Sequence, residues 1–235
     1  MERIDKVISN QMCLTRSEAR RLIKIGKVTM GGTRVKAFDT KVSETDEIIV
    51  DGKPLNFAEK IYIMMNKSQD VVCDDKGKFP YAPDVLPENL RRKDLFCVGR
   101  LDKDTTGLLL ITNDGDFAHK VITPKKQVQK SYLATLSEPI TDENISLAKS
   151  GMTLSDGTKL LSAEVEIVSD DRKTVRFKIS EGKYHQIKRM AGAFDNKVVS
   201  LHRERIGALS IPQNLKIGEA VEIEYSVAQK VFESL

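Results

Sequence analysis

Residues 99–116 read GRLDKDTTGLLLITNDGD, in which an apolar run lies between two pairs of aspartates. The run is too short to cross a membrane and suits a buried β-strand. Asp104, Asp114 and Asp116 are most simply read as turn and cap residues around this strand. Asp102 stands in the tight loop before the strand, at the edge of the expected core. The loop alone does not decide its role, but it makes Asp102 the acid to follow.

The same loop also allows a calcium-site interpretation, because DKDTTG has acids at its first and third positions and glycine at its sixth. A calcium loop needs a glutamate at position twelve and a helix on each side, whereas Asn113 stands there between strand-like flanks. The histidines and cysteines show no zinc-ligand spacing and no disulfide framework. They are His119, His185 and His202, and Cys13, Cys73 and Cys97. We therefore expect no metal.

The composition is that of an ordinary soluble globular protein, with 235 residues, of which 40% are hydrophobic and 31% charged. The length fits one large domain, or a catalytic domain with a small accessory domain. The first ten residues, MERIDKVISN, lack the apolar core of a secretory signal. We expect a cytoplasmic protein that has no membrane partner.

Positive charge is concentrated in two segments, although the net charge is only +4. Residues 1–36 hold nine Lys or Arg against three acids, and residues 172–205 hold ten against three. Such clusters favour contact with a polyanion, with a solvated charged surface as the alternative.

The N-terminal part predicts two helices followed by short strands. Thr15 and Glu18 have capping-box spacing at the start of the second helix, and Gly26 ends it. Gly31-Gly32 and Asp51-Gly52 predict tight turns between strands. The ordered set RIDKVI, TRSEARRLIKIGKVTMGG and DGKPL resembles the S4 RNA-binding domain, with a generic helical cap as the alternative. We assign 1–57 to this domain, with a linker over 53–60.

The remainder, 58–235, is expected to be the catalytic domain. Short strands dominate it: IYIMMN, LFCVG, GLLLIT, QKSYLATL, KLLSAEVEIV and KTVRFKIS. Helices are expected over 114–122, 141–150 and 184–194. Strands joined by tight turns with few helices predict an α+β fold with a mixed, mainly antiparallel sheet.

Three ordered segments carry a second resemblance. GRLDKDTTGLLLITNDGD, QKSYLATL and EGKYHQIKRMAGAFDNKVVSLHRERIG are similar to motifs of pseudouridine synthases, in the branch that modifies ribosomal RNA and often carries an S4 domain. The resemblance implies isomerisation of a uridine without any cofactor. It assigns the catalytic carboxylate to Asp102, a stacking aromatic to Tyr132 and the cation beside the carboxylate to Lys188. Which atom Asp102 attacks stays open.

The resemblance also implies an RNA partner, either 16S ribosomal RNA or a small-subunit assembly intermediate, with uridine 516 as the expected target and a monomeric enzyme. A 23S target and a non-catalytic ribosome-assembly factor are the alternatives. The residues expected to contact RNA are Arg100, Lys130, Arg189, Arg203 and Arg205, and in the S4 unit Arg3, Arg16, Arg20, Arg21 and Lys24. Two positions depart from the family pattern. Lys67-Ser68-Gln69-Asp70 replaces a common Lys-Pro-x-Gly, and Ala191 replaces an aromatic residue.

Overall fold

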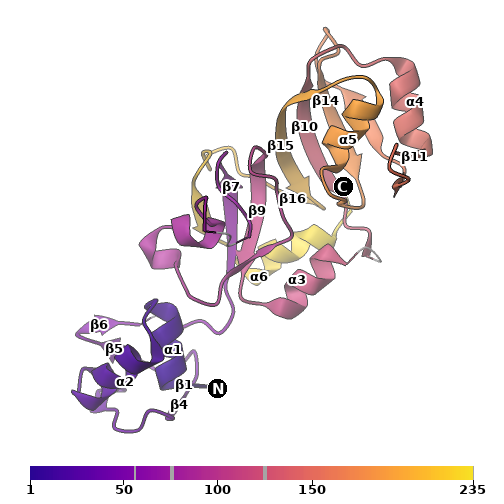
Figure 1. Cartoon of the computed structure of the whole chain (residues 1–235). Coiled ribbons are helices and arrows are strands. Elements are labelled where there is room, and N and C mark those ends of the chain that lie inside the picture. The colour runs from indigo at the N-terminus through magenta and orange to yellow at the C-terminus, as the bar shows by residue number, and fades with distance from the viewer. Residues whose placement is uncertain (56, 75–76, 124–125, 235) are drawn as a thin grey trace.

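The computed structural model describes residues 1–55, 57–74, 77–123 and 126–234. Figure 1 shows the chain passing from a small N-terminal unit into a larger body built on one extended sheet. The N-terminal elements are β1 (Glu2–Arg3), α1 (Ile4–Gln11), α2 (Arg16–Lys24), β2 (Val28–Met30), β3 (Thr33–Arg34), β4 (Lys41–Val42), β5 (Ile48–Val50) and β6 (Lys53–Pro54).

Local sequence signals account for this N-terminal unit. Thr15 and Glu18 form the expected capping box at the start of α2. Gly31-Gly32 and Asp51-Gly52 each join two strands with positive φ at both residues, as a two-residue hairpin requires. The sheet order is β3-β2-β5-β6, and apolar residues of α1, α2 and the strands form a separate core. The expected linker over 53–60 was wrong at its start, because residues 53 and 54 pair with β5; Asn56 lies outside the described residues.

The larger body begins at β7 and includes five strands of at least six residues. Its elements are β7 (Tyr62–Lys67), η1 (Ala82–Val85), η2 (Glu88–Leu90), β8 (Phe96–Val98), β9 (Thr106–Thr112), α3 (Gly115–Ile122), β10 (Lys130–Leu136), α4 (Asp142–Ser150), β11 (Met152–Thr153), β12 (Lys159–Leu160), β13 (Glu164–Ile167), β14 (Thr174–Ile179), α5 (Gln186–Ala193), β15 (Val198–Ile206), β16 (Leu209–Ser210), β17 (Ala220–Glu222), α6 (Tyr225–Ala228) and η4 (Gln229–Phe232).

The main sheet follows the order β13-β14-β10-β15-β9-β7-β17, with β8 and β16 attached at its side. The β9–β15 pairing is parallel and the other pairings of this sheet are antiparallel. This confirms the expected α+β fold with a mixed, mainly antiparallel sheet. Strand KLLSAEVEIV is divided, because β12 pairs with β11 and only β13 joins the main sheet.

Apolar side chains cover both faces of the sheet centre. Alternate residues of β7 and β9 belong to different cores, so that Leu109 and Ile111 meet one core and Leu108 and Leu110 the other. Helices α4 and α5 contribute to the first core, and α3 and α6 to the second. Among the described residues, no helix has the length and apolarity needed to span a membrane.

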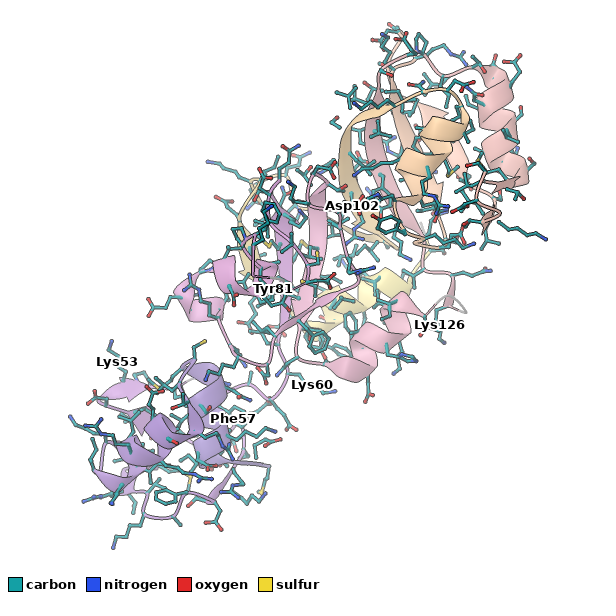
Figure 2. The ribbon with its side chains drawn as sticks, in the orientation of Figure 1. Lys53, Phe57, Lys60, Tyr81, Asp102 and Lys126 are labelled. Carbon is teal, nitrogen blue, oxygen red and sulfur yellow. The ribbon has the colours of Figure 1, made fainter. Side chains whose placement is uncertain are left out.

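Gly107 lets the two halves of the sheet meet. Its backbone has a φ of 108°, and a Cβ atom at this position would lie 2.3 Å from the backbone oxygen of Arg203 on β15. Only glycine fits so close an approach at this φ. The β9–β15 junction places the loop before β9 beside strands β10 and β15, and Figure 2 shows Asp102 at this junction.

Candidate active site

Asp102 lies on the loop between β8 and β9, and its neighbours fix that loop. The backbone N–H of Leu101 donates to Sγ of Cys73 at 3.3 Å, and the Cys73 thiol faces the Leu101 carbonyl at 3.6 Å. Thr105 N–H donates to the Asp102 carbonyl at 3.1 Å, closing a turn. Leu101 and Thr105 are buried on either side, whereas the Asp102 side chain keeps 28% of its surface exposed. The carboxylate is thus presented from a firmly anchored loop.

Lys188, in the first turn of α5, supplies the expected cation. Its Nζ lies 2.9 Å from Oδ2 of Asp102 and 2.5 Å from Oδ1 of Asp104. Burial alone would lower the pKa of Lys188, but the two carboxylates outweigh it and raise that pKa. Asp104 stands on the expected turn, yet its interpretation as a turn residue was incomplete, because its side chain shares Lys188 with Asp102.

His185 is a functional neighbour that its sequence position did not reveal. Its Nε2 lies 3.4 Å from Oδ1 of Asp102, opposite the side held by Lys188. The backbone of His185 has a φ of 48°, and helix α5 therefore begins at Gln186, two residues after the expected start. Gly182, also in this turn, could have marked the segment as a tight connection.

Tyr132 lies across a small cavity from Asp102. The cavity has a volume of about 80 Å³, and Asp102, Tyr132 and Lys188 all line it. Tyr132 is buried on β10 and is paired in register with Arg203 on β15. Arg203 donates from Nε to the Leu108 carbonyl at 2.7 Å and from Nη1 to the Tyr132 hydroxyl at 3.4 Å. The structure therefore brings the three expected catalytic residues together.

A second cavity, of about 260 Å³, opens beside Tyr132 and gathers positive charge. Arg100, Lys130, Lys183 and Arg203 all line it. Burial, and then the charge of Arg203, lowers the pKa of Lys130 to about 8. Within the described ranges neither Lys130 nor Arg203 has an ion-pair partner, and Nη2 of Arg203 is buried without a hydrogen-bond acceptor. Buried cations without a partner favour the binding of an anion at this site.

The other expected RNA contacts differ in their surroundings. Arg203 is only 3% exposed, so its place is inside this second cavity and not on the surface. Arg189 holds a neighbouring hairpin through Asp156 and, at 3.0 Å, Thr158. Arg100 is exposed and pairs with Asp74 at 2.9 Å, and Arg205 is exposed on β15.

The S4 arginines surround an acid that the sequence did not single out. Asp5 is fully buried, and Arg3, Arg16 and Arg20 lie 3.2, 3.2 and 2.9 Å from its carboxylate oxygens. Each arginine keeps at least 40% of its side chain exposed. Asp5 therefore gathers three guanidinium groups at one surface. Arg21 and Lys24 are exposed on α2.

The buried position of Lys67 was not predicted from the sequence. Its side chain is fully buried, and its Nζ donates to the carbonyls of Val71 at 2.8 Å and Ser68 at 2.9 Å. Asp70, where the family commonly has glycine, takes a left-handed backbone with a φ of 62°. Ala191, the other departure, is fully buried in the first core.

Metal binding is a separate question, and the described residues contain no group of three or more His, Cys, Asp or Glu side chains placed to hold an ion. Asn113, at position twelve of the calcium-like loop, hydrogen-bonds the backbone of Ile61 and Glu59. The Asn113 side chain is thus engaged by the backbone of the neighbouring segment.

Comparison with known proteins defines the class. A family model for RNA pseudouridylate synthases matches residues 61–193, and a model for the S4 domain matches residues 2–48. The chain belongs to the RNA pseudouridylate synthase family and carries an S4 domain before its catalytic body. It is thus an isomerase, which confirms the expected enzyme over a non-catalytic assembly factor and the S4 domain over a generic helical cap.

Several relatives refine this assignment. The chain is 39% identical to ribosomal small subunit pseudouridine synthase A of Vibrio cholerae, over 92% of this chain and 94% of that protein. It is 40% identical to the Haemophilus influenzae protein of the same name, over 97% and 99% of the two chains. A crystal structure of a pseudouridylate synthase matches with a TM-score of 0.69 and 36% identity, covering 98% of this chain and 100% of that one.

Proposed function

We propose that this enzyme converts a uridine of 16S ribosomal RNA into pseudouridine, with Asp102 as the catalytic carboxylate. The observation that carries the proposal is the convergence of Asp102, Lys188 and Tyr132, from a loop, a helix and a strand, on one cavity. The small-subunit names of the relatives support a 16S target over a 23S target. Within 16S RNA, uridine 516 is the position that we propose.

The reaction breaks the bond between N1 of uracil and C1′ of the ribose, turns the base, and joins C5 to C1′ as the C5 proton leaves and N1 takes up a proton. Atoms balance within the nucleotide, so no redox equivalent or transferred group is needed. Asp102 acts as nucleophile or base at the ribose or the ring. Lys188 provides a fixed positive charge beside it, and Asp104 helps to orient Lys188. The Tyr132 ring stacks on the target uracil.

The target must first leave its stack in the RNA, at a cost of a few kcal/mol. The cavity lined by Lys130 and Arg203 would accept a phosphate of the same nucleotide, because these two cations have no ion-pair partner among the described residues. Arg205 and Arg189 lie beyond it and would contact the backbone further along. Phosphate contacts of this kind position an RNA without reading its sequence.

The S4 domain supplies a second RNA surface. Asp5 holds Arg3, Arg16 and Arg20, which remain partly exposed. Helix α2, which carries Arg16 and Arg20, also carries the exposed Arg21 and Lys24. We assign this domain to 1–57 and the catalytic domain to 58–235. The substrate is 16S RNA or an assembling small subunit. The enzyme is a monomer and acts in the cytoplasm.

Mapping pseudouridine in cells that lack this protein tests the proposal. Carbodiimide treatment followed by primer extension should show loss of one 16S mark. Re-expression of the natural chain should restore that mark, and Asp102→Asn should not, although the variant folds and binds RNA. A mark lost only from 23S RNA would show that the target is wrong. A mark restored by Asp102→Asn would show that the catalytic residue is wrong.

A further inference from the structure

Tyr184 stands out as a large aromatic side chain left in solvent beside the active site. It is 69% exposed, although Gln186 and Ile187, which follow it closely, are buried. Its ring stacks on the His185 ring, with centroids 3.8 Å apart and an interplanar angle of 18°. His185 therefore covers one face of the tyrosine, and the other face is open as far as the described ranges of the chain show, since no second ring or cation from them packs on it.

The backbone around Tyr184 is held by specific contacts. The Tyr184 carbonyl accepts a hydrogen bond from Nη1 of Arg189 at 3.3 Å, and the Lys183 N–H donates to Oε1 of Gln186 at 3.1 Å. His185 in turn lies against Asp102, with 3.4 Å between Nε2 and Oδ1. The ring is thus fixed at a defined position relative to the catalytic carboxylate, separated from it by one imidazole.

Tyr184 borders a groove that also contains the catalytic residue. The groove has a volume of about 1090 Å³, and both Asp102 and Tyr184 line it. Its walls also carry the cationic side chains of Arg100, Lys103 and Lys183. An aromatic face placed among cations, in a groove that passes the reacting group, is typical of sites for single-stranded nucleic acid.

The groove contains one other exposed aromatic residue, Phe79, which provides a contrast. Nζ of Lys103 lies 4.4 Å from the centre of the Phe79 ring, and Nζ of Lys78 lies 5.6 Å from it. The Phe79 ring is therefore already engaged by the protein's own ammonium groups, whereas Tyr184 offers an open face at a comparable position.

We propose that the open face of Tyr184 stacks on the nucleobase adjacent to the target uridine in the RNA. This inference rests on the proposed function, because a flipped-out uridine is what leaves its neighbour without a stacking partner. The uridine itself occupies the cavity between Asp102 and Tyr132, and the neighbouring base takes the Tyr184 face. The substrate must therefore be unpaired at that neighbour as well as at the target.

The experiment removes the protein ring and the RNA base separately. Binding is measured by fluorescence anisotropy in an Asp102→Asn background, which prevents turnover. The probes are a synthetic RNA oligonucleotide carrying the mapped uridine and two copies with an abasic ribose at the 5′ or the 3′ neighbour. The proteins carry Tyr184 unchanged, Tyr184→Ala or the matched control Tyr184→Phe, and thermal melting verifies that each is folded.

We expect Tyr184→Ala to bind the intact RNA about five- to hundredfold more weakly, the effect of one lost base–aromatic stack. Tyr184→Phe should bind within about twofold of the parent, because it keeps the aromatic face on which the base stacks. The parent should bind one of the two abasic RNAs more weakly than the intact RNA, by the same factor. Tyr184→Ala should bind that abasic RNA and the intact RNA equally well.

The stacking role would be overturned if Tyr184→Ala bound the intact RNA as tightly as the parent does. It would also be overturned if removing the base weakened the binding of Tyr184→Ala as much as that of the parent. The protein with Asp102 intact is assayed in parallel for pseudouridine formation on 16S RNA. If that activity is present and the Tyr184 results are negative, the stacking role alone is wrong. If that activity is absent, the proposed function is wrong and the stacking role falls with it.

Discussion

Replacing Lys67 with methionine tests whether one buried ammonium holds the loop that presents Asp102. Lys67 ends β7, and its Nζ reaches three backbone carbonyls: Val71 at 2.8 Å, Ser68 at 2.9 Å and Lys103 at 3.4 Å. The last of these residues directly follows Asp102 in the chain. The same side chain therefore connects the 68–71 loop with the catalytic loop.

Methionine has a similar volume but donates no hydrogen bond, so the variant leaves buried carbonyls without their donor. Each hydrogen bond from a charged donor contributes about 1.5–3 kcal/mol, and two short ones are lost. Burial lowers the pKa of Lys67, and removing this poorly solvated charge returns part of the loss. We expect the free energy of unfolding to fall by about 2–4 kcal/mol. The melting temperature should fall by about 5–15 °C.

Calorimetry and single-turnover pseudouridine formation measure the two consequences. The rate of the chemical step should fall at least about tenfold, since small displacements of a reacting group are costly. Lys103→Met is the matched control, because its ammonium is exposed and pairs only loosely with Asp70, at 3.5 Å. That control should melt within about 2 °C of the parent. A Lys67→Met protein with parental melting and parental rate would refute the reasoning.

Three further variants test other parts of the molecule. Because the pKa of Lys130 is lowered to about 8, its charge is lost as pH rises through that value. RNA affinity measured by anisotropy should therefore fall between about pH 7 and 9. Lys130→Met should bind RNA more weakly, and its affinity should depend less on pH. Burial raises the pKa of Asp5, but hydrogen bonds from Arg20 and Arg3 lower it overall, below its ordinary 3.8. The stabilisation from Asp5 is therefore present above pH 3.8 and is lost as pH falls through the lower folded-state pKa. Asp5→Asn should cost about 1–3 kcal/mol in urea unfolding at pH 7, and a loss that persisted undiminished in strong acid would contradict the pairing. Gly107→Ala should cost about 2–5 kcal/mol, because its Cβ would meet the Arg203 backbone; unchanged urea unfolding would argue against the close approach.

Local patterns in the sequence were enough to predict the elements that depend on near neighbours. The Thr15–Glu18 capping box, the Gly31-Gly32 and Asp51-Gly52 turns and the buried LLLI strand all follow from spacing and residue type. Asp102, by contrast, was chosen because the chain resembles a known family. Its place in the loop made it the acid to follow but did not decide its role, which depends on contacts with residues far along the chain.

Other features of the site were not predicted because they arise from long-range contacts. Lys188 was expected beside Asp102, but its contact with Asp104, across 84 residues, follows from no local pattern. Arg203 was expected to contact RNA near the active site, and its inward position on β15, where the side chain is buried beside a cavity, was not predicted. Asp5 looked like an ordinary acid in the first turn of a helix until three arginines were found around it.

The parallel pairing of β9 with β15 has a consequence for the order of events during folding. The two strands are distant in sequence, and Arg203 bonds Leu108 across 95 residues. Closing so long a loop is slow and entropically costly, so this junction should form late. Until it does, Asp102 and Tyr132 belong to two separate halves of the sheet. A chain in which β15 has not yet been synthesised therefore has no assembled active site.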